Sequence, residues 1–198
     1  MQSEDQNGSL LHMTTITKQS SPVRWLTDNQ YENLPIAHRS IAWADSQVGV
    51  REQGRNRGRQ VEEYQRVAGL GRGGGYAWCA CFVTWCLIQA GAKWCALPKP
   101  GLCAAVRNWA SWAEESGRLR STPKRGDLFF WLDSQGRGHI GFVLSTWKLD
   151  IIRTIEGNTD GEAGSRDGDG VYKRTRTLRS FQKRHRNGFI DLSNLKCD

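Results

Sequence analysis

The apolar spacing of the chain changes at Pro123, and this change constrains the fold more than any other feature of the sequence. Before Pro123, apolar residues recur at helical spacing in the segments 35–49, 61–68, 78–90 and 106–115. After it come short segments rich in β-branched and aromatic residues, at 127–132, 140–145, 151–155, 171–175 and 188–192. Helices followed by strands predict an α+β fold, in which N-terminal helices pack on a C-terminal antiparallel β-sheet.

The 198 residues are enough for one compact domain and a tail. Residues 1–30 are polar and show no clear period, so we expect a flexible leader before a single domain at 31–198. The longest apolar run, at 77–90, is shorter than the roughly 20 residues that cross a bilayer. The start of the chain also lacks the pattern of a secretory signal. We therefore expect neither a transmembrane segment nor a signal peptide.

The chain is basic, with 28 Lys and Arg against 20 Asp and Glu. Such a balance favours anionic partners: an acidic wall polymer, a membrane surface or nucleic acid. The segment from Lys173 to Arg186 concentrates seven of the cations and no acid. We interpret it as a solvated basic face, with attraction to an anionic wall polymer or lipid as the alternative. Nucleic acid is the least favoured partner.

Cys79 lies in the first turn of the predicted helix 78–90, directly after a loop with five glycines in residues 69–75. Backbone N–H groups at a helix N-terminus stabilise a thiolate, so Cys79 is a candidate nucleophile that the flexible loop delivers. Because cysteine is also a common core residue, position alone leaves both interpretations open. The loop matches the letters GxGxxG, but it follows a helix instead of a strand, which argues against a dinucleotide site.

The other cysteines show no sign of chemistry. They lack the paired CxxC spacing of structural zinc sites, and we expect no metal and no cofactor. Without a secretory signal most of them are expected to be reduced, although a disulfide between Cys95 and Cys103 is possible.

Among the four histidines, His139 is the candidate general base, because it opens a predicted strand after the loop 133–138. If 140–145 and 151–155 form a hairpin that turns around residues 147 and 148, His139 lies directly opposite Glu156. A carboxylate there holds the imidazole in the required tautomer, and Asn158 is an alternative partner. A register slip of one residue would break this pairing.

Four motifs, in this order, resemble those of the CHAP family: residues 76–86 (YAWCACFVTWC), 123–131 (PKRGDLFFW), 138–143 (GHIGFV) and 155–159 (IEGNT). CHAP domains are cysteine, histidine-dependent amidohydrolases/peptidases within the papain-like NlpC/P60 superfamily, and the resemblance spans roughly residues 40–192. It implies a papain-like NlpC/P60 fold and a peptidoglycan hydrolase. By motif match, Cys79 is the nucleophile, His139 the base, Glu156 its orienting group and Asn158 the fourth polar residue.

The resemblance further implies amide cleavage through an acyl-enzyme, as an N-acetylmuramoyl-L-alanine amidase or an endopeptidase. Trp78 and Trp131 are expected either to line the substrate cleft or to belong to the core. Some CHAP domains bind calcium through acidic residues just before the cysteine, but residues 69–76 contain none, so we expect no such metal site. A missing signal fits a phage lysin or an exported effector that is cytoplasmic until it reaches the cell wall.

The alternative hypothesis is a non-catalytic basic module that binds an anionic polymer, either cell wall or nucleic acid. It rests on the net charge of +8 and on the basic segment from Lys173 to Arg186.

Overall fold

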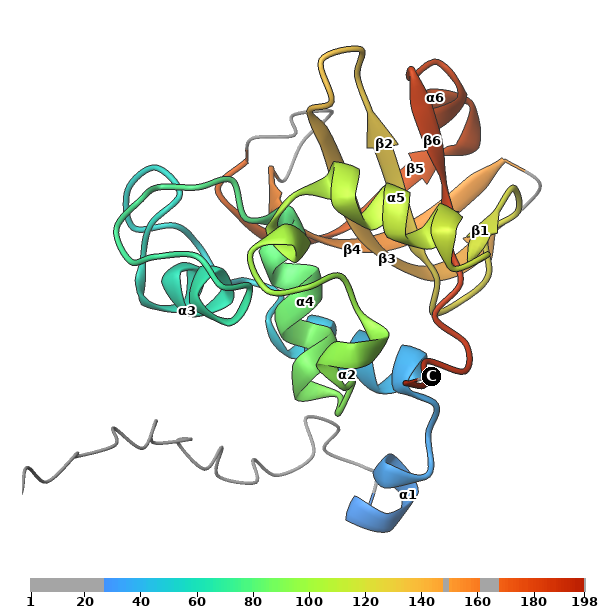
Figure 1. Ribbon diagram of the computed structural model, residues 1–198, viewed down its shortest axis with the longest axis horizontal. Coiled ribbons are helices and arrows are strands. Elements are labelled where there is room, and N and C mark those ends of the chain that lie inside the picture. Colours follow the sequence, from blue (N-terminus) through green and yellow to red (C-terminus); the bar gives the residue numbers. More distant parts are fainter. Residues whose placement is uncertain (1–26, 148–149, 161–167, 198) are drawn as a thin grey trace, which may run out of the picture.

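The computed structural model describes residues 27–147, 150–160 and 168–197 (Figure 1). Its centre is a six-stranded antiparallel sheet with the strand order β1-β6-β2-β3-β4-β5. The strands are β1 (Leu119–Arg120), β2 (Leu128–Leu132), β3 (Gly138–Trp147), β4 (Ile151–Thr159), β5 (Gly170–Thr177) and β6 (Arg186–Ile190). The predicted α+β architecture with an antiparallel sheet is confirmed.

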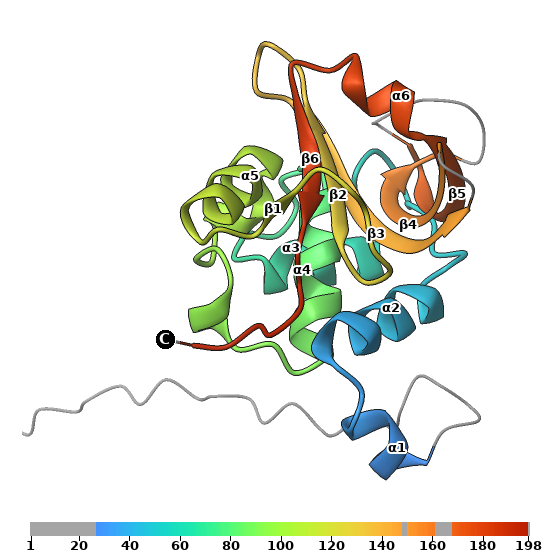
Figure 2. The same cartoon turned by 90° about the vertical axis from the view of Figure 1, so that its right-hand side faces the viewer.

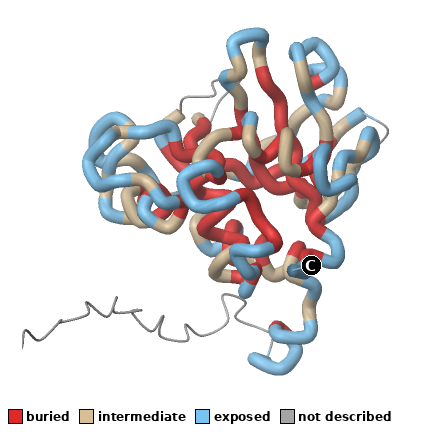
Figure 3. The backbone as a smooth tube through the Cα atoms, viewed as in Figure 1, coloured by how far each residue is buried: buried red, intermediate tan, exposed pale blue. Residues whose placement is uncertain are grey.

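The helices precede the sheet in the chain, apart from the last one. They are α1 (Asp28–Glu32), α2 (Ile36–Ser46), α3 (Arg59–Val67), α4 (Cys79–Gln89), α5 (Val106–Glu115) and α6 (Leu178–Gln182), with 3-10 turns η1 (Trp94–Ala96) and η2 (Leu102–Ala104). In α4, residues 79–87 are all buried, so this helix is the centre of the core rather than an amphipathic surface helix. Figure 3 shows the same buried stretch beside the central strands.

The two faces of the sheet carry cores of different size, because successive strand residues point to opposite sides. In β2, Leu128 and Phe130 pack into the large core with the helices, whereas Phe129 and Trp131 belong to a smaller cluster. That smaller cluster includes Phe181 of α6, which lies on the opposite side of the sheet from α5 (Figure 2).

The predicted helices and strands are all present, but their bounds differ in places. The leader expected at 1–30 lies outside the described residues as far as 26, and α1 begins within it at Asp28, after an N-terminal capping box at Thr27. The short β1 and α6 were not predicted, since two and five residues are too few to show a period.

Most of the cysteines are free thiols, as expected, namely Cys79, Cys81, Cys86 and Cys103. The disulfide that the sequence left possible between Cys95 and Cys103 does not form. Cys95 forms a disulfide with Cys197, and this bond joins the end of the chain to η1. Cys103 is instead a buried free thiol that donates a hydrogen bond to the carbonyl oxygen of Ala68, with a 3.4 Å separation. No helix in the described chain is long and apolar enough to span a membrane.

Candidate active site

Cys79 is the first residue of α4, and only 5% of its surface is exposed to solvent. Trp78 occupies the N-cap position, and its side chain makes no capping hydrogen bond to the first-turn N–H groups of α4. A helix begins here because the glycine loop ends at Gly75 and an apolar run of good packing residues follows. Cys79 thus lies where a helix presents N–H donors without intrahelical partners and the positive end of its dipole.

Strand β4 approaches the start of α4 at Gly157. A Cβ atom at this position would lie 2.7 Å from both Phe82 Cγ and Trp78 Cζ3, which is closer than real Cβ contacts allow. Only glycine therefore permits this approach. The residues before and after Gly157, which are Glu156 and Asn158, are brought close to the N-terminal turn of α4 in this way.

The hairpin of β3 and β4 has a different register from the predicted one. Phe142 pairs with Ile155, and a bulge between Val143 and Ser145 shifts the register by one residue. Without this bulge, Glu156 would share a face with Phe142 and point towards the helices. With it, Glu156 shares the face of His139, so the predicted contact forms although the predicted pairing is wrong.

Gly141 makes the space that Glu156 needs. A Cβ atom on Gly141 would lie 2.9 Å from Glu156 Cγ and 2.8 Å from the carbonyl oxygen of Ile155. His139 lies two residues earlier on the same face of β3 and pairs across the sheet with Trp131 of β2. The Glu156 side chain can therefore cross over Gly141 to reach the imidazole.

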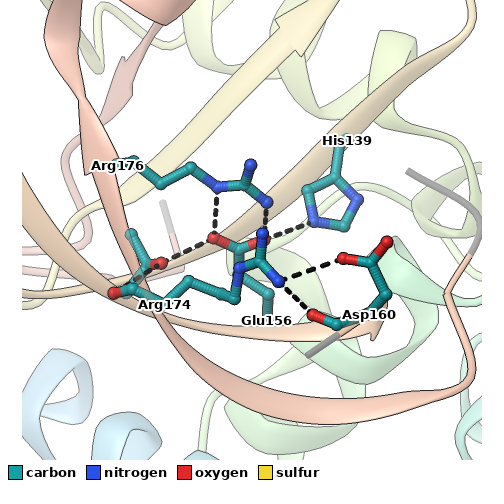
Figure 4. A network of polar contacts seen from close by, with 6 residues as sticks. His139, Glu156, Asp160, Arg174 and Arg176 are labelled. Carbon is teal, nitrogen blue, oxygen red and sulfur yellow. Dashed lines mark hydrogen bonds and ion pairs between the residues drawn. The ribbon is translucent and has the colours of Figure 1, made fainter. Parts of the chain in front are cut away.

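Glu156 is completely buried and accepts hydrogen bonds on both carboxylate oxygens (Figure 4). His139 Nε2 donates to Oε2 at 2.9 Å, and Thr154 Oγ1 donates to Oε1 at 2.5 Å. Arg176 of β5 donates hydrogen bonds to both oxygens, from Nε to Oε1 at 2.8 Å and from Nη2 to Oε2. This bidentate geometry is the strongest form of guanidinium–carboxylate pairing. Thr154 and Arg176 were not identified from the sequence.

These contacts set the ionisation of the site. Burial alone would raise the pKa of Glu156, but the hydrogen bonds from Arg176 and His139 hold it well below its usual value. Burial likewise lowers the pKa of His139, yet its interactions with Cys79 and Glu156 outweigh burial and raise that pKa to about 9. The pair is therefore a carboxylate and an imidazolium at neutral pH.

The Cys79 side chain lies close enough to His139 to help raise the pKa of the imidazole. Because Glu156 occupies Nε2, the other ring nitrogen, Nδ1, is the one left for the thiol. Nδ1 is buried and makes no hydrogen bond of normal length and angle with the described residues, so the interaction with Cys79 is a loose one. Catalytic hydrogen bonds in the absence of substrate are often long in this way.

The remaining predicted site residues have different surroundings. Asn158 of β4 is fully buried, and its backbone adopts the left-handed conformation, with φ of 56°. Its backbone carbonyl oxygen accepts a hydrogen bond from the N–H of Gly168 at 3.2 Å. Trp78 belongs to the core, where it stacks on Tyr64 and has no exposed surface to offer a substrate. Trp131 is 8% exposed and lies beside His139, with ring centroids 6.3 Å apart.

The glycine loop is held in place by side chains from the segment before it. Arg57 Nη2 donates to the carbonyl oxygen of Gly73 at 2.7 Å, and Asn56 Nδ2 donates to that of Gly75 at 3.1 Å. Gln65, which is buried, donates to the carbonyl oxygen of Tyr76 at 2.7 Å. The expectation that this loop delivers Cys79 flexibly is thus corrected, because three side chains fix the backbone that leads into α4.

The segment from Lys173 to Arg186 is not one solvated basic face. Lys173 pairs with Asp45, Arg174 with Asp160, Arg176 with Glu156 and Arg186 with Glu114. The cations of this segment that take part in none of these pairs are Arg179, Lys183 and Arg184, which are exposed on and just after α6.

No cluster of three or more His, Cys, Asp or Glu side chains suited to a metal ion occurs in the described part of the chain.

Residues 71–158 match the family model of the CHAP domain, which confirms the resemblance to this family for that part of the chain. The matched range includes Cys79, His139 and Glu156 and ends at Asn158. Among solved structures the chain is similar to one described as "The crystal structure of Ly7917", with 16% sequence identity and a TM-score of 0.44. The alignment covers 79% of this chain and 62% of that one. A search of curated proteins found no match. CHAP domains are typically amidase- or peptidase-type hydrolases that act on peptidoglycan.

Proposed function

We propose that the protein is a peptidoglycan hydrolase that cleaves an amide bond through the thiolate of Cys79. The observation that carries the proposal is the hydrogen bond from His139 to the buried Glu156, at 2.9 Å, with Cys79 close enough to affect the same imidazole. Nucleophile, base and orienting group in this order are the parts that covalent catalysis of acyl transfer requires.

In the proposed reaction, Cys79 Sγ attacks the carbonyl carbon of the scissile amide. The His139 imidazolium then gives the proton on the nitrogen facing Cys79 to the departing amine, and the C–N bond breaks. A water molecule, deprotonated by His139, attacks the resulting thioester and releases the acid product with a free Cys79. Glu156 holds the imidazole in one orientation throughout, because Arg176 and Thr154 fix the carboxylate in turn.

The negative charge on the tetrahedral intermediate needs hydrogen-bond donors. The N–H groups in the first turn of α4 are suited to this role, since the Trp78 side chain does not cap them and Cys79 itself carries one. Asn158 is proposed as a further polar member of the site, by its match to the family motif.

The mechanism distinguishes Cys79 from the other free cysteines. Burial raises the pKa of the thiols of Cys81, Cys86 and Cys103, whereas Cys79 lies at the helix start beside an imidazolium. Iodoacetamide should therefore alkylate Cys79 first and abolish activity in proportion to its modification.

The decisive experiment incubates purified peptidoglycan with the unmodified protein, with Cys79→Ala and with Cys81→Ala, and identifies soluble products by mass spectrometry. We expect fragments from the unmodified protein and from Cys81→Ala, the matched control in the same helix, but none from Cys79→Ala. A new amine on L-alanine would assign an amidase, and one elsewhere in the peptide an endopeptidase. Equal release by Cys79→Ala would exclude Cys79 as the nucleophile.

The second candidate is a basic module that binds an anionic polymer without cleaving it. The exposed cations Arg179, Lys183 and Arg184 favour it. It predicts salt-sensitive binding to walls and no release of fragments by any variant. A lysin-like or exported role, with the protein acting after it reaches the wall, goes with the hydrolase proposal and is tested by adding the protein to intact cells from outside.

A further inference from the structure

The three exposed cations on and after α6 surround a hollow in the surface. Its volume is about 410 Å³, and it is lined by Thr177, Arg179, Ser180, Lys183 and Arg184. No carboxylate is among these residues, and no ion pair between described residues involves Arg179, Lys183 or Arg184. The Ser180 hydroxyl donates to the backbone carbonyl oxygen of Thr177 at 2.6 Å. The hollow thus combines three uncompensated positive charges with the hydroxyl of Thr177, which is the chemistry of an anion-binding site.

The hollow adjoins the proposed active site. The Arg184 guanidinium lies over the indole of Trp131, 4.2 Å from the ring centroid. Trp131 is the direct cross-strand partner of His139, and the two rings are 6.3 Å apart. The hollow is therefore linked to His139 through the indole of Trp131, which contacts Arg184 and lies beside the imidazole.

Arg184 is held in this position by its backbone and by its ring contact. Its N–H donates to the carbonyl oxygen of Phe181 at 2.9 Å, and Phe181 is buried in the small core between α6 and the sheet. Stacking on Trp131 then orients the guanidinium plane. A cation with a fixed place relative to His139 can select a substrate, whereas a freely moving surface cation provides only general attraction.

We infer that this hollow is a subsite for a carboxylate of the wall peptide whose amide bond is cleaved at Cys79. The inference rests on the proposed function and names the feature of the substrate that is recognised. The Trp131 ring lies 6.3 Å from the His139 ring and 4.2 Å from the Arg184 guanidinium, so at most about three residues of an extended peptide, at roughly 3.3 Å each, separate His139 from Arg184. A free carboxylate of the wall peptide within that reach is an anion with which Arg pairs in a planar, bidentate manner.

A phosphate-containing wall polymer is the competing ligand for the same charges. Such a polymer is attached away from the stem peptide, so it does not require a cation at a fixed distance from the catalytic histidine. The stacking of Arg184 on the partner of His139 favours the peptide carboxylate.

The test compares Arg184→Ala with Arg107→Ala, which removes one equal charge from the exposed surface of α5. The substrate is peptidoglycan freed of phosphate polymers, with its carboxylates either free or converted to amides. On the free acid we expect Arg184→Ala to raise KM roughly tenfold or more, as for loss of one charge-assisted hydrogen bond. The value of kcat should change little, and Arg107→Ala should behave like the unmodified protein. On the amidated substrate the difference between Arg184→Ala and the unmodified protein should vanish.

Equal KM values for Arg184→Ala and Arg107→Ala would overturn the inference, and so would an equal loss on the amidated substrate. An effect seen only on walls that retain their phosphate polymers would assign the hollow to that polymer instead. A circular-dichroism melting curve of each variant checks that it folds, and Arg184→Lys should restore part of the affinity.

A binding measurement separates this inference from the proposed function. Soluble stem-peptide fragments are titrated into Cys79→Ala protein, with and without Arg184→Ala, using free and amidated forms. Weaker binding of the free form after Arg184→Ala supports the subsite even if no fragment release is ever detected. If the unmodified protein cleaves walls but this titration shows no effect of Arg184, only the subsite is rejected.

Discussion

The pKa values of two buried carboxyl groups of this protein are shifted in opposite directions. Glu156 on β4 is completely buried, and its pKa lies well below its usual value. Asp127, immediately before β2, is 3% exposed, and burial raises its pKa to about 6. The difference is the partner: Glu156 has the guanidinium of Arg176 on both oxygens, whereas Asp127 accepts mainly from the backbone N–H of Lys124, at 2.8 Å.

The comparison shows that burial does not decide whether a carboxyl group is charged. Burial disfavours the charge at both positions, and a paired cation reverses that effect only at Glu156. A permanently charged Glu156 keeps His139 as an imidazolium, which is the form that stabilises a neighbouring thiolate. The electrostatic state of the proposed active site thus depends on Arg176, a residue that touches neither Cys79 nor His139 in any described hydrogen bond.

The largest effect is expected for Arg176→Met, which makes the surroundings of Glu156 resemble those of Asp127. Removing one member of a buried ion pair leaves the other charge uncompensated and costs about 3–5 kcal/mol. We expect this loss in the free energy of unfolding, measured with urea at pH 7, together with a fall in kcat of roughly a hundredfold. Arg176→Lys should recover part of both, since it restores the charge but not the bidentate geometry.

Arg174→Met is the matched control for Arg176→Met. Arg174 is the neighbouring arginine on the same strand, but its partner Asp160 has a side chain that is 33% exposed. Water can solvate Asp160 after the substitution, so the loss of stability should be smaller and kcat should stay near its original value. Equal losses for the two variants would show that the pairing of Glu156 has no special role.

The next effect concerns the pH dependence of Glu156→Gln. The pKa of His139 is raised to about 9, partly by Glu156, so the imidazolium persists until the pH passes that value. The stability that this shift contributes is present below the ordinary histidine value of 6.5 and is lost as the pH rises through about 9. We expect kcat/KM of the unmodified protein to fall above pH 9.

Replacing Glu156 by Gln removes one of the interactions that raise the pKa of His139. The alkaline fall of kcat/KM should then move to lower pH, with roughly ten- to hundredfold lower activity at the optimum. Glu156 also contributes stability above its ordinary value of 4.5 that is lost as the pH falls below it, because its own pKa is lowered. Glu156→Gln should lack this acid-side loss. If the alkaline fall of kcat/KM occurs at the same pH in Glu156→Gln as in the unmodified protein, Glu156 is not the partner that raises the pKa of His139.

A smaller effect is expected for Gly141→Ala, whose new Cβ would crowd the Glu156 side chain, the carbonyl oxygen of Ile155 and the ring of Phe129. The new Cβ would lie 2.9 Å from Glu156 Cγ, so the carboxylate must shift by several tenths of an ångström. We expect about 1–3 kcal/mol of lost stability and roughly tenfold lower kcat. Gly188→Ala in β6 is the control, since its Cβ meets nothing closer than 3.4 Å. Similar losses for both would show that the space beside Glu156 is not limiting.

The sequence predicted the parts of the site that short motifs encode. Cys79 at a helix start and His139 at a strand start follow from local patterns, and the contact of His139 with Glu156 follows from a hairpin. The register of that hairpin was wrong because β3 extends to Trp147, which pairs with Ile151, so the turn comes later than the predicted position at residues 147 and 148. A bulge between Val143 and Ser145, which leaves no mark in the apolar pattern, then shifts the register by one residue.

The rest of the site depends on contacts between distant segments. Arg176 belongs to a basic run, and a run of this kind looks the same in sequence whether its cations are solvated or paired inside the fold. Trp78 fits either a cleft or a core, and only the stacking on Tyr64 decides between them. The partner of Cys95 proved to be Cys197, which is 102 residues away, a pairing that spacing cannot identify.

The smallest effect, and one of opposite sign, is expected for Asp127→Asn. Asp127 has a raised pKa, so its neutral form is favoured by the fold: the contribution to stability is present below about pH 4 and lost as the pH rises through about 6. Asparagine keeps an oxygen that accepts from Lys124 N–H but carries no charge to bury. The variant should match the unmodified protein in urea unfolding near pH 4 and exceed its stability by about 1–2 kcal/mol at pH 7. The same exchange at Glu156 should lower stability at pH 7, because there the charge is paired with Arg176. Two variants that shift stability in the same direction would contradict the view that the paired cation, rather than burial, separates these two carboxyl groups.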